Sequence, residues 1–154
     1  MNTPKKLKYF AGGEWLESKT DKYMDVFNPS TGEVLAHAPR CTKDEVEYAI
    51  KCAREAFPGW SSIPVAKRVQ VLYNFRTLLE DNLDELTDMV AREHGKVWDE
   101  AKGDILKVKE PVELACGAPT LMMGESLMNT SKGFDSVLYR EPVGVFGCIV
   151  PFNF

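Results

Sequence analysis

The chain carries few side chains whose type and spacing could do chemistry on their own. Its four cysteines are widely and irregularly spaced with no CxxC pair, and it has only two histidines, so the sequence predicts no metal site. Gly144 and Gly147 form a GxxG pair, which is too common to indicate a phosphate-binding loop. Asn153 offers a neutral amide at the end of the apolar run VGVFGCIVPFNF (143–154). By residue type alone, a turn asparagine that bonds its own backbone is the more frequent case.

Composition and charge are those of an ordinary globular protein and argue against two kinds of partner. A chain of 154 residues is long enough for one domain with its own core, and 44% of its residues are hydrophobic and 27% charged, as in ordinary globular proteins. A net charge of −4 and a pI near 5.3 argue against nucleic acid, because neutralising phosphates requires a basic surface. The N-terminus has no apolar signal-peptide core, and no long apolar run predicts a membrane span. Reduced thiols then favour a cytoplasmic location.

Two hairpins are predicted near the N-terminus, after a flexible segment over residues 1–6. In YFAGGEW (9–15), the Gly-Gly pair can take the positive φ values of a tight turn. In MDVFNPSTGEVLAHAP (24–39), the Asn-Pro pair opens a turn and Gly32 permits a left-handed residue.

The pattern then changes to helical spacing. Thr42 and Glu45 form a capping box, in which each side chain can bond the backbone N–H of the other residue. Apolar residues follow at intervals of three and four, and the Pro58-Gly59 pair is predicted to end this helix.

Two further helices are predicted from apolar spacing and from glycine and proline positions. One continuous apolar stripe extends between Pro64, which suits a first helical turn, and Gly95, which stops the helix. A third helix begins near Trp98. Pro111 should kink or break it, because proline has no N–H for the carbonyl of Lys107.

The last part of the chain is predicted to be a loop over 124–135, followed by strands over Ser136–Glu141 and Val143–Val150. Helices in series without intervening parallel strands cannot complete a nucleotide-binding domain. The predicted fold class is therefore α/β, with β-hairpins, three long helices and a strand pair leading into an incomplete Rossmann-type sheet.

Several motifs, taken in chain order, resemble the aldehyde dehydrogenase family. They are GGEW, NPSTGEV, FPGW, EHGK and the tail LYREPVGVFGCIVPFNF. The stretch CGAPTLMMGESL (116–127), and PFNF in place of PWNF, are similar to the methylmalonate-semialdehyde dehydrogenase branch. The resemblance implies NAD as cofactor, a small semialdehyde as substrate, CoA as co-substrate with loss of carbon dioxide, and a homo-oligomer that is a dimer or tetramer.

The resemblance also implies roles for residues of this chain. Asn153 would be catalytic, because its amide would stabilise the alkoxide formed when a thiolate attacks the aldehyde; losing such a donor costs about 3 kcal/mol. Val150, Pro151 and Phe152 would contact the cofactor near the nicotinamide-side ribose, where residue types alone suggest only a core strand ending in proline. Lys107 stands where the branch has arginine and would bind the substrate carboxylate as a point charge. A solvated lysine on a lysine-rich helix is the open alternative.

The same resemblance implies a division of the chain. Residues 7–135 would form the hairpin and helical part of the NAD-binding domain, 136–150 the oligomerisation strands and first sheet strand, and 151–154 the start of the active-site motif. The catalytic domain would be absent, and no cysteine matches the family's nucleophile, so the isolated chain is expected to oxidise no aldehyde. Two alternatives stay open: a non-enzymatic truncated paralogue that self-associates, and a fragment of a CoA-independent aldehyde dehydrogenase.

Overall fold

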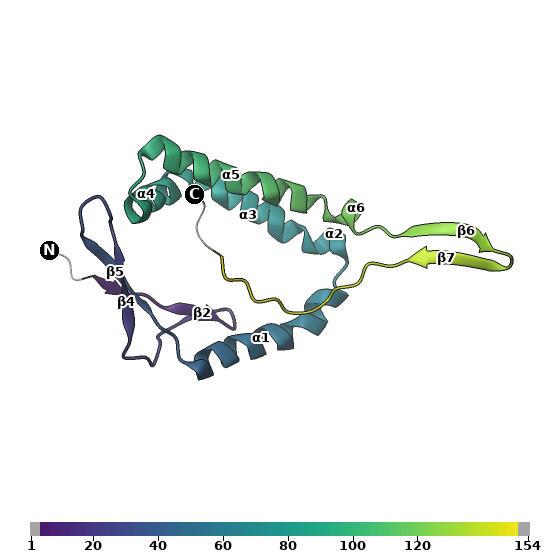
Figure 1. The fold of residues 1–154 in the computed structure, drawn as a ribbon, viewed down its shortest axis with the longest axis horizontal. Helices are drawn as coiled ribbons and strands as arrows, with labels where there is room; N and C mark the ends of the chain where they lie inside the picture. Colours follow the sequence, from purple (N-terminus) through teal and green to yellow (C-terminus); the bar gives the residue numbers. More distant parts are fainter. Residues whose placement is uncertain (1–3, 151–154) are drawn as a thin grey trace.

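A computed structural model describes residues 4–150, and in it strands, helices and a second set of strands follow one another along the chain (Figure 1). The strands are β1 (Lys5–Lys6), β2 (Tyr9–Ala11), β3 (Glu14–Leu16), β4 (Tyr23–Phe27), β5 (Val34–Pro39), β6 (Glu125–Ser131) and β7 (Phe134–Leu138). The helices are α1 (Lys43–Ser62), α2 (Val65–Arg68), α3 (Gln70–Asp81), α4 (Leu83–His94), α5 (Trp98–Cys116) and α6 (Ala118–Leu121).

Both N-terminal hairpins are confirmed. β2 pairs antiparallel with β3 around Gly12 and Gly13, and β4 pairs antiparallel with β5. The predicted flexible segment over residues 1–6 does not extend to Lys5 and Lys6, which form β1 and pair in parallel with β5. The physical reason is that β5 would otherwise present an open edge, and β1 takes up its backbone groups. Residues 1–3 lie outside the described part of the chain.

Helix α1 begins as predicted but ends later. The Thr42 N–H donates to Glu45 Oε2 at 2.7 Å, and the Glu45 N–H donates to Thr42 Oγ1 at 3.4 Å, so the capping box is confirmed. The predicted end at Pro58 is wrong, because α1 continues to Ser62. Proline removes one helical N–H, but the hydroxyl of Ser62 donates to the Gly59 carbonyl at 2.8 Å and supports the final turn.

The long helix predicted between Pro64 and Gly95 is divided into α2, α3 and α4. One break lies at Asn82, whose side-chain amide donates to the Leu78 carbonyl at 2.8 Å and whose φ of −110° departs from helical values. Such a side chain competes with the backbone ladder. The predicted end is confirmed, since Gly95 adopts a left-handed φ of 77°. The stripe residues Leu72, Leu79, Leu83, Leu86 and Val90 are half-buried, so an apolar stripe predicts a partly covered face, and not an unbroken backbone.

Helix α5 lies along α3 and α4 and provides much of the buried surface (Figure 1). It starts at Trp98 as predicted, but the break predicted at Pro111 is wrong, because the helix continues to Cys116. Pro111 lies on the exposed face, where water can bond the carbonyl that lacks a partner. The helix is held in place by the buried residues Ala101, Asp104, Ile105, Val112 and Cys116.

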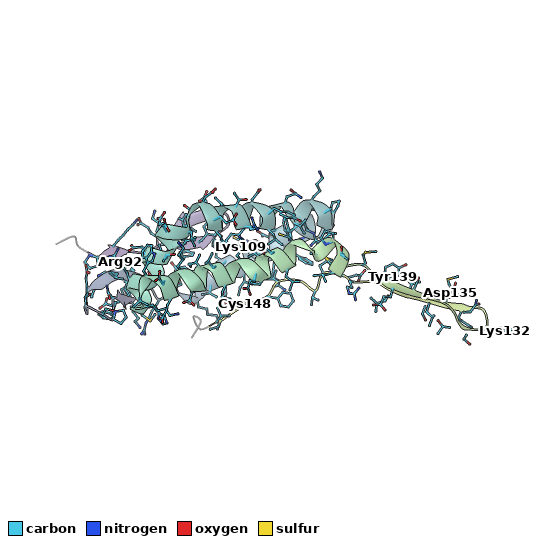
Figure 2. The ribbon with its side chains drawn as sticks, turned by 90° about the horizontal axis from the view of Figure 1, so that it is seen from above. Arg92, Lys109, Lys132, Asp135, Tyr139 and Cys148 are labelled. Atoms are coloured by element: carbon cyan, nitrogen blue, oxygen red, sulfur yellow. The ribbon has the colours of Figure 1, made fainter. Side chains whose placement is uncertain are left out.

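A two-stranded ribbon, here called the arm, is formed by β6 and β7 and extends away from the helices (Figures 1 and 2). The loop predicted over 124–135 is therefore wrong, and the strand predicted over Ser136–Glu141 begins earlier, at Phe134. The sequence pattern was obscured because both faces of the arm are exposed, so no apolar alternation marks β6. A residue with positive φ, Asn129, also interrupts the register of the pair.

Residues 143–150 do not form a strand in the described structure, so the strand predicted over Val143–Val150 is wrong. A strand requires a hydrogen-bonded neighbour, and the sheets among the described residues pair only β1–β5–β4, β2–β3 and β6–β7. Of the range 136–150, to which oligomerisation strands were assigned, only 136–138 belong to a described strand, β7, and the role in oligomerisation stays a prediction.

Candidate functional site

The structure describes two of the five predicted site residues. Lys107 lies on the exposed face of α5. Val150 is the last described residue and is largely exposed. Pro151, Phe152 and Asn153 lie outside the described residues, so their predicted roles stay predictions.

Lys107 borders a cavity of about 480 Å³ beside the first half of α5. The cavity is lined by Lys96, Glu100, Gly103, Asp104 and Lys107. The last four recur at intervals of three, one and three residues, which places them on one face of the helix. Lys96 reaches the same face from the loop that follows the left-handed Gly95.

A buried ion pair fixes one wall of this cavity. The Lys96 ammonium donates to Asp104 Oδ2, and the two side chains are only 13% and 6% exposed. Removing one partner of such a pair leaves an uncompensated buried charge, so the pair fastens the loop after α4 to α5. Sequence reasoning missed it. A lysine directly after a helix-ending glycine, with an aspartate two turns into the next helix, was the available signal.

The lysines of α5 face in two different directions. Lys109 forms an ion pair with Glu80 of α3, and this bond lowers the pKa of Glu80. Arg76 joins the same cluster, donating to Glu80 at 2.9 Å and to Glu113 at 2.7 Å, and the bond to Glu113 raises the pKa of Arg76. Lys109 therefore ties α5 to α3, whereas Lys107 is the lysine of α5 that lines the cavity.

Lys107 is held by a neighbour on its own helix. Its ammonium lies 2.9 Å from Glu110 Oε1 and 3.1 Å from Glu110 Oε2, and both side chains are largely exposed. The cation therefore contacts a complete carboxylate group at the edge of the cavity. This arrangement can bind a small carboxylate in place of Glu110.

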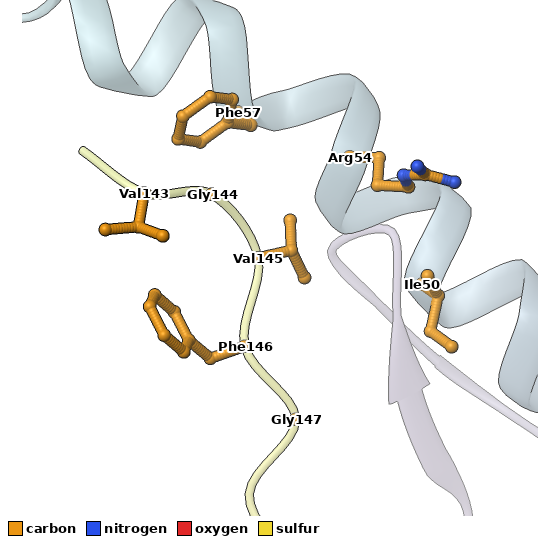
Figure 3. A pocket seen from close by; sticks show the side chains of 8 residues that line it. All are labelled: Ile50, Arg54, Phe57, Val143, Gly144, Val145, Phe146 and Gly147. Atoms are coloured by element: carbon orange, nitrogen blue, oxygen red, sulfur yellow. The ribbon is translucent and has the colours of Figure 1, made fainter.

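A second cavity, of about 500 Å³, lies between α1 and the segment 143–147 (Figure 3). Val145 points toward α1 while Phe146 points away from it, as expected for an extended backbone. The lining from α1 consists of Ile50, Arg54 and Phe57. The cavity thus separates α1 from the segment that leads to the predicted active-site motif, and Ile50, Phe57 and Val145 give it a partly apolar lining.

Other kinds of site find little support among the described residues. Within residues 4–150, no group of three or more histidine, cysteine, aspartate or glutamate side chains could hold a metal ion. In the same part of the chain, no helix is both long and apolar enough to cross a membrane. The four cysteines are free thiols, of which Cys148 is exposed (Figure 2).

Comparison with known families decides the wider identity of the chain. Residues 15–154 match the aldehyde dehydrogenase family. This chain belongs to that family. The resemblance drawn from GGEW, NPSTGEV and the PFNF tail is therefore confirmed.

Curated relatives of this aldehyde dehydrogenase chain point to one branch of the family. Malonate-semialdehyde dehydrogenase 2 of Oceanobacillus iheyensis is 47% identical over 154 residues, which is 100% of this chain and 32% of the relative. Malonate-semialdehyde dehydrogenase 2 of Bacillus cereus is 48% identical with the same coverage. The chain thus spans about a third of the length of the curated relatives it matches.

Solved structures confirm the aldehyde dehydrogenase-like α/β fold. A protein of Sinorhizobium meliloti, assigned as a methylmalonate-semialdehyde dehydrogenase and complexed with NAD, matches with a TM-score of 0.93 and 34% identity, covering 100% of this chain and 31% of that one. The methylmalonate-semialdehyde dehydrogenase of Oceanimonas doudoroffii matches with a TM-score of 0.84 and 36% identity, covering 90% and 28%. The order of hairpins, helices, arm and extended segment is therefore that of a larger enzyme's first third.

Proposed function

We propose that this chain is the N-terminal part of an NAD-dependent dehydrogenase that oxidises malonate semialdehyde or its methyl-substituted homologue. The observation that carries the proposal is identity of 47–48% over all 154 residues with malonate-semialdehyde dehydrogenases from two genera. CoA as co-substrate, with loss of carbon dioxide, and a cytoplasmic location belong to the same proposal.

The substrate of this reaction carries two functional groups that need different partners. Its carboxylate would be bound by Lys107, which lines a cavity on α5. Its aldehyde would be attacked by a thiolate from outside these 154 residues. The oxygen then becomes an alkoxide, and the Asn153 amide would donate to it without bringing a competing negative charge.

The cofactor would lie along the segment that ends at Phe152. NAD supplies the acceptor for the hydride that leaves the oxidised carbon. Residues 143–150 fit this place because they are extended and form no ladder with another described strand, so their backbone groups are open to a ligand or to a neighbouring strand. Val150, Pro151 and Phe152 would contact the nicotinamide-side ribose, chiefly through the backbone.

The arm supports a homo-oligomer as the form of the protein. A two-stranded ribbon alone is marginally stable in water, yet every residue of β6 and β7 is exposed in the single chain. The exposed set includes the large apolar side chains Leu127, Met128, Phe134 and Val137. Pairing of the arm with another copy would cover them, in a dimer or a tetramer.

The experiment begins with the protein from its source cells, because its intact mass identifies the polypeptide that carries these residues. NADH formation is then measured with malonate semialdehyde, in the presence and absence of CoA, with propanal as the uncharged comparison. The expected result is CoA-dependent NADH formation with a preference for the semialdehyde. Absence of NADH formation with every semialdehyde would reject the proposal.

Two variants test the assigned residues in that protein. Asn153→Ala should lower kcat by about 10²–10³ while NAD binding is retained, because only the transition state loses its donor. Lys107→Ala should raise KM for malonate semialdehyde and leave KM for propanal unchanged. A 154-residue polypeptide alone should form no NADH; a native mass near 17.3 kDa would favour the self-associating, non-enzymatic alternative.

A further inference from the structure

The contact that prompts the inference is the pair between Lys107 and Glu110. Both carboxylate oxygens of Glu110 lie within hydrogen-bond distance of the Lys107 ammonium, at 2.9 and 3.1 Å. A semialdehyde that carries a carboxylate would present the same group to the same cation. Glu110 therefore occupies the position at Lys107 that such a substrate requires.

Two other lysines near this part of α5 are held more firmly. Lys96 is paired with Asp104, and both side chains are almost completely buried. Lys109 is paired across to α3, with Glu80. The pair of Lys107 with Glu110, in contrast, is confined to one exposed helix face, and such pairs change an equilibrium constant by only about twofold. A ligand can displace Glu110 at little cost.

The other charges around the cavity make Lys107 the group on which binding of an anionic substrate depends. Asp104 and Lys96 neutralise each other, and Glu100 adds a negative charge to the lining. Attraction for an anionic substrate then depends on Lys107. A lysine ammonium has three N–H donors, and the ammonium of Lys107 contacts both carboxylate oxygens of Glu110. An arginine at this position would differ, because its forked guanidinium could contact two carboxylates at once.

We propose that Glu110 is a specificity-determining residue that competes with the substrate carboxylate for Lys107. Glu110 thereby weakens the preference of the enzyme for carboxylate-bearing aldehydes over uncharged ones. The inference rests on the proposed function, since it assumes that Lys107 meets the carboxylate of a semialdehyde. It adds a residue that acts through Lys107 and does not touch the reacting atoms.

The test compares KM values of the full-length protein with malonate semialdehyde and with propanal. Glu110→Gln removes the competing charge and keeps the size of the side chain. We expect KM for malonate semialdehyde to fall about twofold, as for loss of a surface pair, with KM for propanal and both kcat values unchanged. Glu55→Gln is the matched control, because it removes the same charge from another exposed lysine pair, on α1.

Two further variants show whether the effect passes through Lys107. In a Lys107→Ala background, Glu110→Gln should no longer change KM for malonate semialdehyde. In a Lys107→Arg background the change should be smaller than with lysine, since the guanidinium has donors for both carboxylates.

The possible outcomes separate the two proposals. If Glu110→Gln leaves KM for malonate semialdehyde unchanged or raises it, while Lys107→Ala raises it, the competition is wrong and the proposed function stands. If Lys107→Ala has no effect on an active enzyme, the substrate role of Lys107 and the competition both fail. If the protein oxidises no semialdehyde, the proposed function is rejected, and the inference is rejected with it.

Discussion

The helices and the arm of this chain are stabilised in different ways. Helix α5 packs on α3 and α4 and buries Ala101 and Thr87 completely. The arm leaves the helices and carries Lys132 and Asp135 away from them (Figure 2), and all residues of its two strands are exposed. The helices therefore depend on contacts within the chain. The arm has its backbone ladder and a few exposed polar bonds, such as that from the Asn129 N–H to Asp135 Oδ1 at 2.8 Å. A ribbon of this kind is only marginally stable by itself in water.

The comparison also explains where large apolar side chains lie. In the helical part, the completely buried residues are small, because α3, α4 and α5 approach closely. In the arm, Phe134 is 70% exposed and Leu127 and Met128 are similarly open. Apolar groups exposed together on a projecting ribbon are typical of an interface. One region should then respond to mutation through folding, and the other through association.

The largest effect is expected at the centre of the helical part. Ala101 is 0% exposed, so Ala101→Asp places an unpaired charge, and extra volume, between packed helices. We expect the free energy of unfolding to fall by roughly 3 kcal/mol or more, measured by urea denaturation with circular dichroism. Met128→Asp, the matched control on the arm, should change it by less than about 0.5 kcal/mol. Equal losses in the two variants would contradict the division between helices and arm.

The next effect concerns association through the arm. Phe134→Asp should weaken self-association by about 2 kcal/mol, or roughly 30-fold in the dissociation constant, if Phe134 is a central interface residue. Sedimentation equilibrium measures this constant. The free energy of unfolding of the separated chain should be nearly unchanged, since the side chain is exposed. An unaltered dissociation constant would place the interface elsewhere.

Local signals in the sequence predicted the parts of the fold that local physics determines. The Gly12-Gly13 turn, the capping box of Thr42 and Glu45 and the left-handed Gly95 all appeared where expected. In each case the residues that set the conformation are neighbours in the chain. Their preferences therefore survive in the folded structure.

The incorrect predictions share a different cause. Pro58 and Pro111 were expected to interrupt helices, yet α1 and α5 pass through both. A proline costs a helix about 3 kcal/mol, and for α5 the apolar face packed on α3 and α4 outweighs that cost. Strand β6 was missed because all of its residues are exposed, so no apolar alternation marks it. Tertiary contacts thus overrode local preference, and a single sequence does not show them.

The candidate site likewise has residues that the sequence indicated and contacts that only the structure shows. Lys107, Val150 and Asn153 were named because the chain resembles a family, and the family is confirmed, while their roles stay predictions. The pair between Lys96 and Asp104 and the contact of Lys107 with Glu110 were not anticipated. Both depend on how a loop and a helix face meet, and that is a property of the fold.

A pH-dependent effect tests how the N-terminal strands are attached to the helices. Glu45 is 6% exposed and accepts bonds from the Lys19 N–H at 2.7 Å and the Ser18 hydroxyl at 2.8 Å. The hydrogen bonds to the Glu45 carboxylate lower its pKa from 4.5 to about 2, and the largest effects come from the backbone N–H groups of Lys19 and Thr42. Because the folded state has the lower pKa, this stabilisation is complete above pH 4.5 and is lost as pH falls toward 2.

The measurement is the free energy of unfolding as a function of pH. Between pH 4.5 and 2, Glu45→Gln should lose less stability than the unmodified chain, because it has no carboxylate to protonate there. Glu47→Gln, an exposed glutamate of the same helix paired with Lys43, is the control and should keep the original slope. Identical slopes for all three proteins would show that Glu45 is not the anchor of these strands.

The smallest expected effect has the opposite sign and lies at the candidate site. Gly103 is inside α5, and a Cβ built on it meets nothing within 4 Å. Gly103→Ala should therefore stabilise the helix by about 0.5–1 kcal/mol, since alanine has the higher helix propensity. Thermal unfolding of the chain would show a Tm higher by roughly 2–4 °C. Gly103 also lines the Lys107 cavity, where the added methyl group would take space from a ligand bound at Lys107. Raised KM for malonate semialdehyde in the same variant would support that reading, and unchanged KM with raised Tm would leave Gly103 as a helix residue without a role in binding.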